Sequence, residues 1–266
     1  MPTLTRPDGV ALHWEASGQG PAVLIGDNLF SIPQAFRPLA EDLERDHAVL
    51  QYHPRGTGDS TRTGPYDLET DVGDLEAILE QAEGPAAVVG PSNGAAVATI
   101  CAVRRPDLIS AVIAPIGPPV RLAERFEAET GMGVSRSVLE AIDTQIESDY
   151  RGIVRTMTVT GNPQASEEDH RKRTEIQVAY CPQEAAAGRW RAWSRGDQTD
   201  EAIKLGPRLW VLLHPYMPWF PPELADPLRE VLPEAHIEVV EDGPVSRPDI
   251  TSAIVRQITE DNSNTS

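Results

Sequence analysis

The 266-residue sequence contains only two cysteines and no long hydrophobic run. Cys101 and Cys181 lie too far apart in the chain to indicate a disulfide framework, and two cysteines exclude a cysteine-rich zinc site. No apolar run reaches about 18 residues, the minimum for a membrane-spanning helix. The N-terminus lacks the basic and apolar regions of a signal peptide. These absences predict a cytoplasmic protein with one large domain.

Basic residues are scarce, with 23 against 41 acidic residues and a formal net charge of −18 at pH 7. A surface this acidic repels phosphate backbones and anionic lipids, so neither nucleic acid nor a membrane is expected as a partner. We expect a small-molecule partner, and the sequence leaves open whether the chain forms a homo-oligomer. The histidines and cysteines show no metal-ligand spacing, so no metal and no cofactor are expected.

Short apolar runs alternate with amphipathic stretches along most of the chain. This alternation predicts an α/β fold with a mostly parallel central sheet and helices on both faces. It stops after residue 119, and residues 137–150 carry apolar side chains at helical spacing. The prediction is therefore a core of residues 1–119 and 205–260, an inserted helical cap of residues 120–204, and a disordered tail at 261–266.

The segment VVGPSNGAAVA, residues 88–98, contains the pattern G-x-S-x-G around Ser92. A strand-like run precedes it and a helix-like run follows, which is the context of a nucleophile elbow. In such a turn the serine hydroxyl stands above the sheet, and backbone N–H groups face a developing oxyanion. Ser92 is therefore a candidate nucleophile, and it would need a histidine base oriented by a carboxylate.

Three further segments follow in order: YHPRGTGDS (52–60), AVRRPDLISAVIAPIGPP (102–119) and LWVLLHPYMPWFPPELA (209–225). Together with the elbow they resemble the α/β-hydrolase superfamily, nearest its capped small-molecule hydrolases and proline-iminopeptidase-like members. The resemblance covers nearly the whole chain outside the cap and implies an α/β-hydrolase fold. It also implies an oxyanion hole formed by the N–H of Asn93 and that of Asn28 or Leu29.

The same resemblance implies a histidine after the last strand and an acid after the strand near Val211, and both are missing. Pro244 stands where the histidine is expected, and no histidine follows His236. Met217 stands where the acid is expected. Losing one triad member typically costs several powers of ten in rate. Efficient hydrolysis by the usual Ser–His–acid mechanism is therefore not expected.

His53, His214 and Asp27 are candidates for a replacement base, and Glu241 and Asp242 precede Pro244 and could also reach the site. His53 stands where relatives carry an aspartate, in a turn at the functional edge of the sheet. Asp27 lies beside the oxyanion loop and would act as a base if burial raised its pKa. The aromatic residues in and beside the cap, together with Met217, fit two alternatives equally well. They line an apolar pocket, or they belong to the ordinary packing of the core and the cap. The candidate pocket residues are Asp27, Phe30, Trp190, Tyr216, Met217, Trp219 and Pro244.

Three functions remain open at this point. The favoured one is a cofactor-free biosynthetic enzyme of secondary metabolism (a cyclase, lyase, dehydratase or isomerase) acting on an apolar, polyketide-like small molecule. The second is a serine hydrolase of the esterase or lactonase type that uses Ser92 with His53 as base. The third is a non-catalytic protein that binds a small molecule. The first is favoured because an intact elbow stands beside an acid loop that has become apolar.

Overall fold

The computed structural model describes residues 2–30, 33–120, 136–215, 220–241 and 247–264. Within these residues, eight strands form one sheet in the order β1-β2-β4-β3-β5-β6-β7-β8. Strand β2 is antiparallel to both of its neighbours, and all later pairings are parallel. The prediction of a mostly parallel sheet is confirmed. The strands are β1 (Thr3–Thr5), β2 (Ala11–Ser17), β3 (Ala22–Ile25), β4 (Ala48–Tyr52), β5 (Ala86–Val89), β6 (Ile109–Ala114), β7 (Leu209–Leu213) and β8 (His236–Val239).

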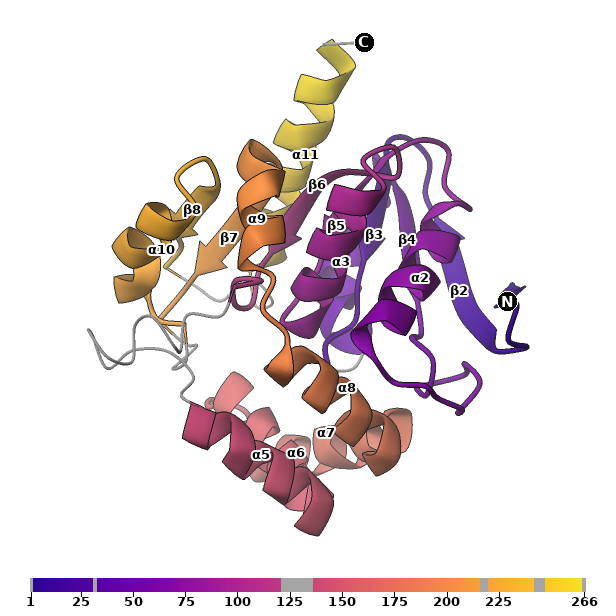
Figure 1. The fold of residues 1–266 in the computed structure, drawn as a ribbon, viewed down its shortest axis with the longest axis vertical. Coiled ribbons are helices and arrows are strands. Elements are labelled where there is room, and N and C mark those ends of the chain that lie inside the picture. The colour runs from indigo at the N-terminus through magenta and orange to yellow at the C-terminus, as the bar shows by residue number, and fades with distance from the viewer. Residues whose placement is uncertain (1, 31–32, 121–135, 216–219, 242–246, 265–266) are drawn as a thin grey trace.

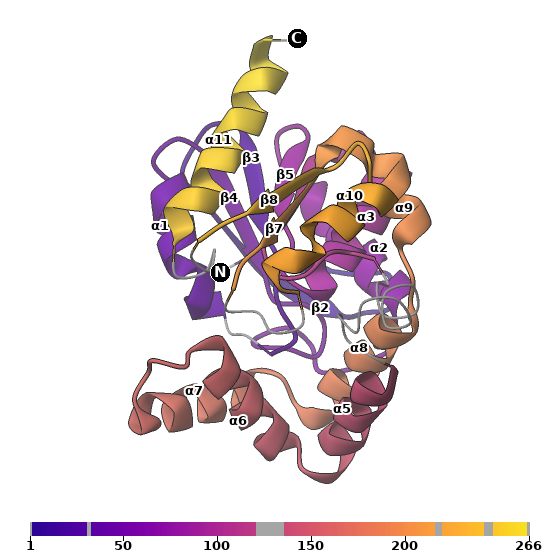
Figure 2. The same ribbon diagram turned by 90° about the vertical axis from the view of Figure 1, so that its left-hand side faces the viewer.

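Helices cover both faces of the sheet, as Figures 1 and 2 show: α1 and α11 lie on one face, and α2, α3, α9 and α10 on the other. The central strands β3, β5 and β7 are buried along their whole length, because helices exclude water from both faces. The core helices are α1 (Arg37–Leu43), α2 (Leu68–Leu79), α3 (Asn93–Arg104), α9 (Thr199–Leu205), α10 (Ala225–Val231) and α11 (Pro248–Asn264), with short 3-10 turns η1 (Pro33–Phe36), η2 (Gly206–Arg208) and η3 (Pro222–Leu224).

Strand alternation divides the core between these two faces. Ala22 and Leu24 of β3 belong to the apolar cluster under α2 and α3, whereas Val23 and Ile25 belong to the cluster under α1 and α11. Helix α11 continues to Asn264, into the stretch for which the sequence predicted disorder. No helix of the described residues is long and apolar enough to cross a membrane.

A separate helical layer, here called the cap layer, lies between β6 and β7 in the chain and beside one end of the sheet in space (Figure 1). It has its own apolar cluster, which includes Ile146, Val154 and Ala186. Helix α9, the last helix of the predicted cap segment, packs on α3 and so joins the core. The helices of the cap layer are α5 (Arg136–Ser148), α6 (Tyr150–Gly161), α7 (Glu167–Tyr180) and α8 (Gln183–Arg195).

Candidate functional site

Ser92 occupies a sharp turn between β5 and α3. Its φ of 54° and ψ of −120° place it in a strained region, and it alone among the described non-glycine residues has a positive φ. Such a conformation costs about 1–3 kcal/mol and persists only where the surroundings enforce it. A Cβ on Gly94 would stand 2.8 Å from the backbone oxygen of Asp27, so the turn needs glycine there. Ser92 therefore has the backbone geometry of a nucleophile elbow.

Hydrogen bonds from neighbouring strands hold this turn in place. The Ser92 N–H donates to the Ile116 carbonyl at 2.8 Å, and the Gly90 N–H donates to Ile113 at 2.8 Å. The Gly26 N–H donates to the Val89 carbonyl at 2.8 Å, which ties the loop after β3 to the end of β5. The elbow is thus fixed by both strands that flank β5.

The backbone groups of the loop after β3 form hydrogen bonds with other groups of the protein. The Leu29 N–H donates to Asn93 Oδ1 at 3.0 Å, and the Asn28 N–H donates to Asp27 Oδ1 at 2.7 Å. The Leu29 carbonyl accepts from Gln177 Nε2 of α7 at 2.9 Å. The sequence predicted Asn28 or Leu29 as an oxyanion donor, but both amides are already engaged. The third predicted donor, Asn93, stands at the first turn of α3, where the helix itself leaves the backbone N–H unpaired.

Asp27, Asp71 and Arg189 form a buried charge cluster between the core and the cap layer. Arg189 of α8 donates from Nε to Asp71 Oδ2 at 3.3 Å, and its Nη1 lies 3.5 Å from Asp27 Oδ2. Asp27 Oδ2 accepts no hydrogen bond from the described residues. Burial raises the pKa of Asp27 to about 6, with the Arg189 charge opposing the rise. Burial likewise raises the pKa of Asp71. The condition that sequence analysis set for Asp27 as a base is therefore met.

His53 lies at the end of β4, away from the elbow. Its Nδ1 accepts the Asp59 N–H at 3.0 Å, and its ring stands 4.8 Å from the ring of His13 and 5.3 Å from that of Tyr180. Since β3 separates β4 from β5, the two strand ends are about 10 Å apart. No hydrogen bond among the described residues joins His53 to Ser92. A catalytic role for His53 stays a prediction, and these contacts do not connect it to the elbow.

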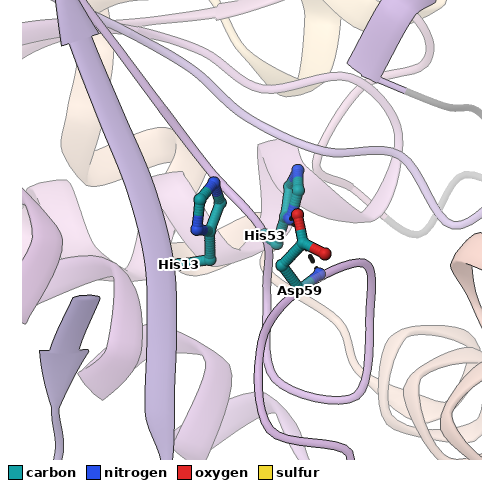
Figure 3. Close-up of side chains that lie close together, drawn as sticks. All are labelled: His13, His53 and Asp59. Atoms are coloured by element: carbon teal, nitrogen blue, oxygen red, sulfur yellow. Dashed lines mark hydrogen bonds and ion pairs between the residues drawn. The ribbon is translucent and has the colours of Figure 1, made fainter. Parts of the chain in front are cut away.

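His13, His53 and Asp59 form a group that the sequence did not predict. Figure 3 shows the three side chains close together. One ligand atom from each lies within 4.8 Å of the others. The expectation that the chain binds no metal rested on residue spacing along the sequence, and it stays a prediction. The residues meet because the β2–β4 register places Trp14 opposite Tyr52, and hence His13 opposite His53. This pairing of distant segments leaves no local spacing pattern in the sequence.

Trp190, predicted as a pocket wall, belongs to the interior of the cap layer. It is 4% exposed, and its Nε1 donates to the Leu139 carbonyl at 3.3 Å. The Phe30 ring packs against it at 5.9 Å between centroids. Trp190 is therefore a cap core residue that secures the loop carrying Phe30. The other candidates Tyr216, Met217, Trp219 and Pro244 lie outside the described residues.

A small cleft runs along the ends of β2, β4 and β3. It brings Asp27 and His53, two of the predicted site residues, to the walls of one hollow, together with His13. A second small cleft is lined by residues that include Asp27, Asp71 and Arg189. Asp27 is thus shared by both clefts. Sequence reasoning missed Arg189, because nothing in an amphipathic cap helix marks which arginine reaches the core.

No protein-family model matches the chain. Among curated proteins, it is similar to the pimeloyl-acyl-carrier-protein methyl ester esterase of Aliivibrio salmonicida, with 27% identity over 162 residues. That match covers 59% of this chain and 59% of the esterase, so the chain spans about three fifths of that relative. It is also 31% identical over 112 residues to polyketide synthase ThaQ of Burkholderia thailandensis, covering 41% of this chain and 5% of the synthase.

Solved structures share the fold over almost the whole chain. The esterase of Exiguobacterium antarcticum gives a TM-score of 0.82 at 18% identity and covers 96% of this chain and 98% of that one. The bromoperoxidase of Bacillus anthracis gives a TM-score of 0.80 at 17% identity, covering 94% and 96%. The strand order, the elbow and these structures show that the chain has the α/β-hydrolase fold.

Proposed function

We propose that the chain is a cofactor-free biosynthetic enzyme that transforms an apolar acyl substrate without hydrolysing it. One observation carries the proposal: the strained elbow at Ser92 is kept, while the histidine and acid it would need are missing from the sequence. Strained backbone conformations of this kind cluster at active sites and ligand-binding sites. A serine without its base is a weak nucleophile but remains a good hydrogen-bond donor.

Asp27 supplies the proton-transfer group in this proposal. A carboxyl group with a pKa near 6 exchanges protons readily close to neutral pH. The carboxylate takes a proton from the carbon next to the substrate carbonyl, and the electron pair moves to the carbonyl oxygen. The Ser92 hydroxyl and the Asn93 N–H stabilise the resulting enolate. Asp27 then returns the proton at another atom, or the enolate expels a leaving group or closes a ring.

The relatives support an acyl substrate. One is named for an ester of an acyl-carrier-protein-bound acid, and another is a polyketide synthase. Both names describe proteins that handle activated acyl chains, and the proposed substrate for this chain is a polyketide-like acyl compound of secondary metabolism. A second candidate function, a serine esterase with a relocated base, is favoured by the elbow geometry and by the esterase relatives.

The first experiment separates these two functions. The protein and its Ser92→Ala variant are treated with a fluorophosphonate probe and with short-chain p-nitrophenyl esters. We expect neither labelling nor turnover, because the sequence lacks a histidine and an acid at the positions that the α/β-hydrolase resemblance implies. Labelling that Ser92→Ala abolishes, with ester turnover, would refute the proposal and establish the esterase.

The second experiment tests the proposed chemistry directly. Thioester analogues of β-ketoacyl chains are incubated in deuterated water, and deuterium uptake next to the carbonyl is followed by mass spectrometry. We expect uptake that Asp27→Asn reduces by about 10²–10⁴-fold, the usual contribution of a general base. Asp226→Asn, a change of the same kind at an exposed residue of α10, is the matched control and should leave uptake unchanged. Uptake that is equal in wild type and Asp27→Asn would refute the role of Asp27.

A further inference from the structure

His13, His53 and Asp59 come from β2, from the end of β4 and from the turn that follows it (Figure 3). His53 Nδ1 lies 3.8 Å from Asp59 Oδ2, and the two imidazole rings are 4.8 Å apart and tilted by 35°. Two imidazoles and one carboxylate are a donor set suited to Zn²⁺ and similar divalent ions. The group thus combines suitable ligands with close approach.

The backbone around this group is held by a dense set of hydrogen bonds. The His53 N–H donates to the His13 carbonyl at 2.9 Å. On the other side of the pair, Ser60 Oγ accepts the His13 N–H at 2.9 Å and donates to the His53 carbonyl at 2.5 Å. The Thr61 N–H donates to Ala11 at 2.9 Å. Both histidines and the turn that carries Asp59 are therefore positioned by their main chains.

The His53 ring presents one of its nitrogens to the Asp59 turn. Its Nδ1 accepts the Asp59 N–H at 3.0 Å, so this nitrogen carries a lone pair directed at the turn. A ring nitrogen with a lone pair is the form of imidazole that binds a metal ion.

We propose that His13, His53 and Asp59 bind one Zn²⁺ ion, with the fourth coordination position open toward the cleft along β2 and β4. Bond lengths of about 2.0–2.2 Å place the donors of a tetrahedral ion about 3.4 Å apart. The donors here lie within 4.8 Å of one another, so Zn²⁺ binding would bring the most distant pair closer by up to about 1.4 Å. The Asp59 side chain is 75% exposed and free to turn inward, and Zn²⁺ replaces the Asp59 N–H at Nδ1.

The bound ion would connect β2, β4 and the turn that follows β4. The proposed zinc site includes neither Ser92 nor Asp27. An experiment that refutes the zinc site therefore leaves the proposed function untouched, and the reverse also holds. Because an ion that binds only the folded state stabilises it, Zn²⁺ is expected to raise the melting temperature as its concentration exceeds the dissociation constant.

The test is a calorimetric titration of Zn²⁺ into the full chain, purified without a histidine tag and freed of metal by chelation. We expect one ion per chain, with affinity that falls steeply below about pH 6 as the histidines take up protons. The variants are His13→Gln, His53→Gln and Asp59→Asn, each close in size to the native residue. Each should weaken binding by at least about tenfold, since even partners outside the coordination shell contribute that much.

His236→Gln is the matched control, because it removes one histidine from β8, at the opposite side of the sheet, where the ring stacks on Trp210. It should leave the Zn²⁺ affinity unchanged. Circular dichroism of each variant establishes that it is folded. Absence of stoichiometric binding by the wild type would overturn the proposal. Binding that Asp59→Asn and His53→Gln leave intact would overturn it as well, since Asp59 is exposed and its change does not threaten folding.

Discussion

Replacing Asp27 by asparagine should stabilise the fold at neutral pH. The carboxylate is 8% exposed, one of its oxygens accepts no hydrogen bond from the described residues, and Arg189 only partly offsets the cost of its burial. Asparagine keeps the shape and the carbonyl oxygen that accepts the Asn28 N–H, and it carries no charge to bury. The protein therefore holds at this position a charge that its own stability disfavours.

The size of the effect follows from the pKa of Asp27. A rise from 3.8 to about 6 corresponds to about 3 kcal/mol, because a tenfold change in acidity is about 1.4 kcal/mol. Between these two pH values the folded state holds a proton that the unfolded state has lost. The wild type should therefore lose stability as the pH rises through this window, up to about 3 kcal/mol above pH 6.

The assay is urea denaturation of wild type and Asp27→Asn at about pH 4 and about pH 7.5. The stability gain of Asp27→Asn over wild type, measured as the free energy of unfolding, should be about 2.5 kcal/mol larger at about pH 7.5 than at about pH 4. Asp226→Asn on the exposed surface is the control and should differ from wild type by less than about 0.5 kcal/mol. A variant that is equally or less stable than wild type at about pH 7.5, with no change in the difference between the two pH values, would refute the reasoning.

Three further predictions concern the elbow and the charge cluster. Ser92→Gly should be about 1 kcal/mol more stable than Ser92→Ala in urea denaturation, because only glycine adopts a positive φ without strain; equal stabilities would contradict a strained elbow. Gly94→Ala should destabilise the fold by about 1–3 kcal/mol, since its methyl group would meet the Asp27 oxygen at 2.8 Å; a neutral change would show that the loop yields freely. Arg189→Met should cost about 3–5 kcal/mol, because it leaves two carboxyl groups buried without a cation. In thermal denaturation this loss should shrink below about pH 6, where Asp27 is neutral, and a pH-independent loss would contradict the pairing.

The sheet and the elbow were predictable because both depend on neighbours in the chain. The apolar runs that became β3 and β5 are buried on both faces, and such strands appear in a sequence as continuous apolar segments. Ser92 follows one of these runs and precedes a helical pattern, so its turn could be placed from the sequence alone. The resemblance rests on the same local segments, and the α/β-hydrolase fold that it implied is confirmed.

The chemistry around the elbow was less predictable because it depends on contacts between distant segments. The side chain of Asn93 accepts the backbone N–H of Leu29, and Arg189 forms an ion pair with Asp27 from the cap layer. Neither contact has a signature in the local sequence. The pairing of His13 with His53 follows from the register between β2 and β4. The spacing of residues along the chain does not reveal this register unless it is known which strands are neighbours.

The backbone of Leu29 connects the elbow to the cap layer through its two polar groups. Its N–H is held by Asn93 on the first turn of α3, and its carbonyl is held by Gln177 on the cap helix α7. These groups belong to consecutive peptide planes that meet at the Leu29 Cα, so rotation about the two backbone bonds of Leu29 can separate them. A displacement of α7 would therefore act directly on the Leu29 carbonyl and would reach the side chain next to Ser92 only through these two rotations.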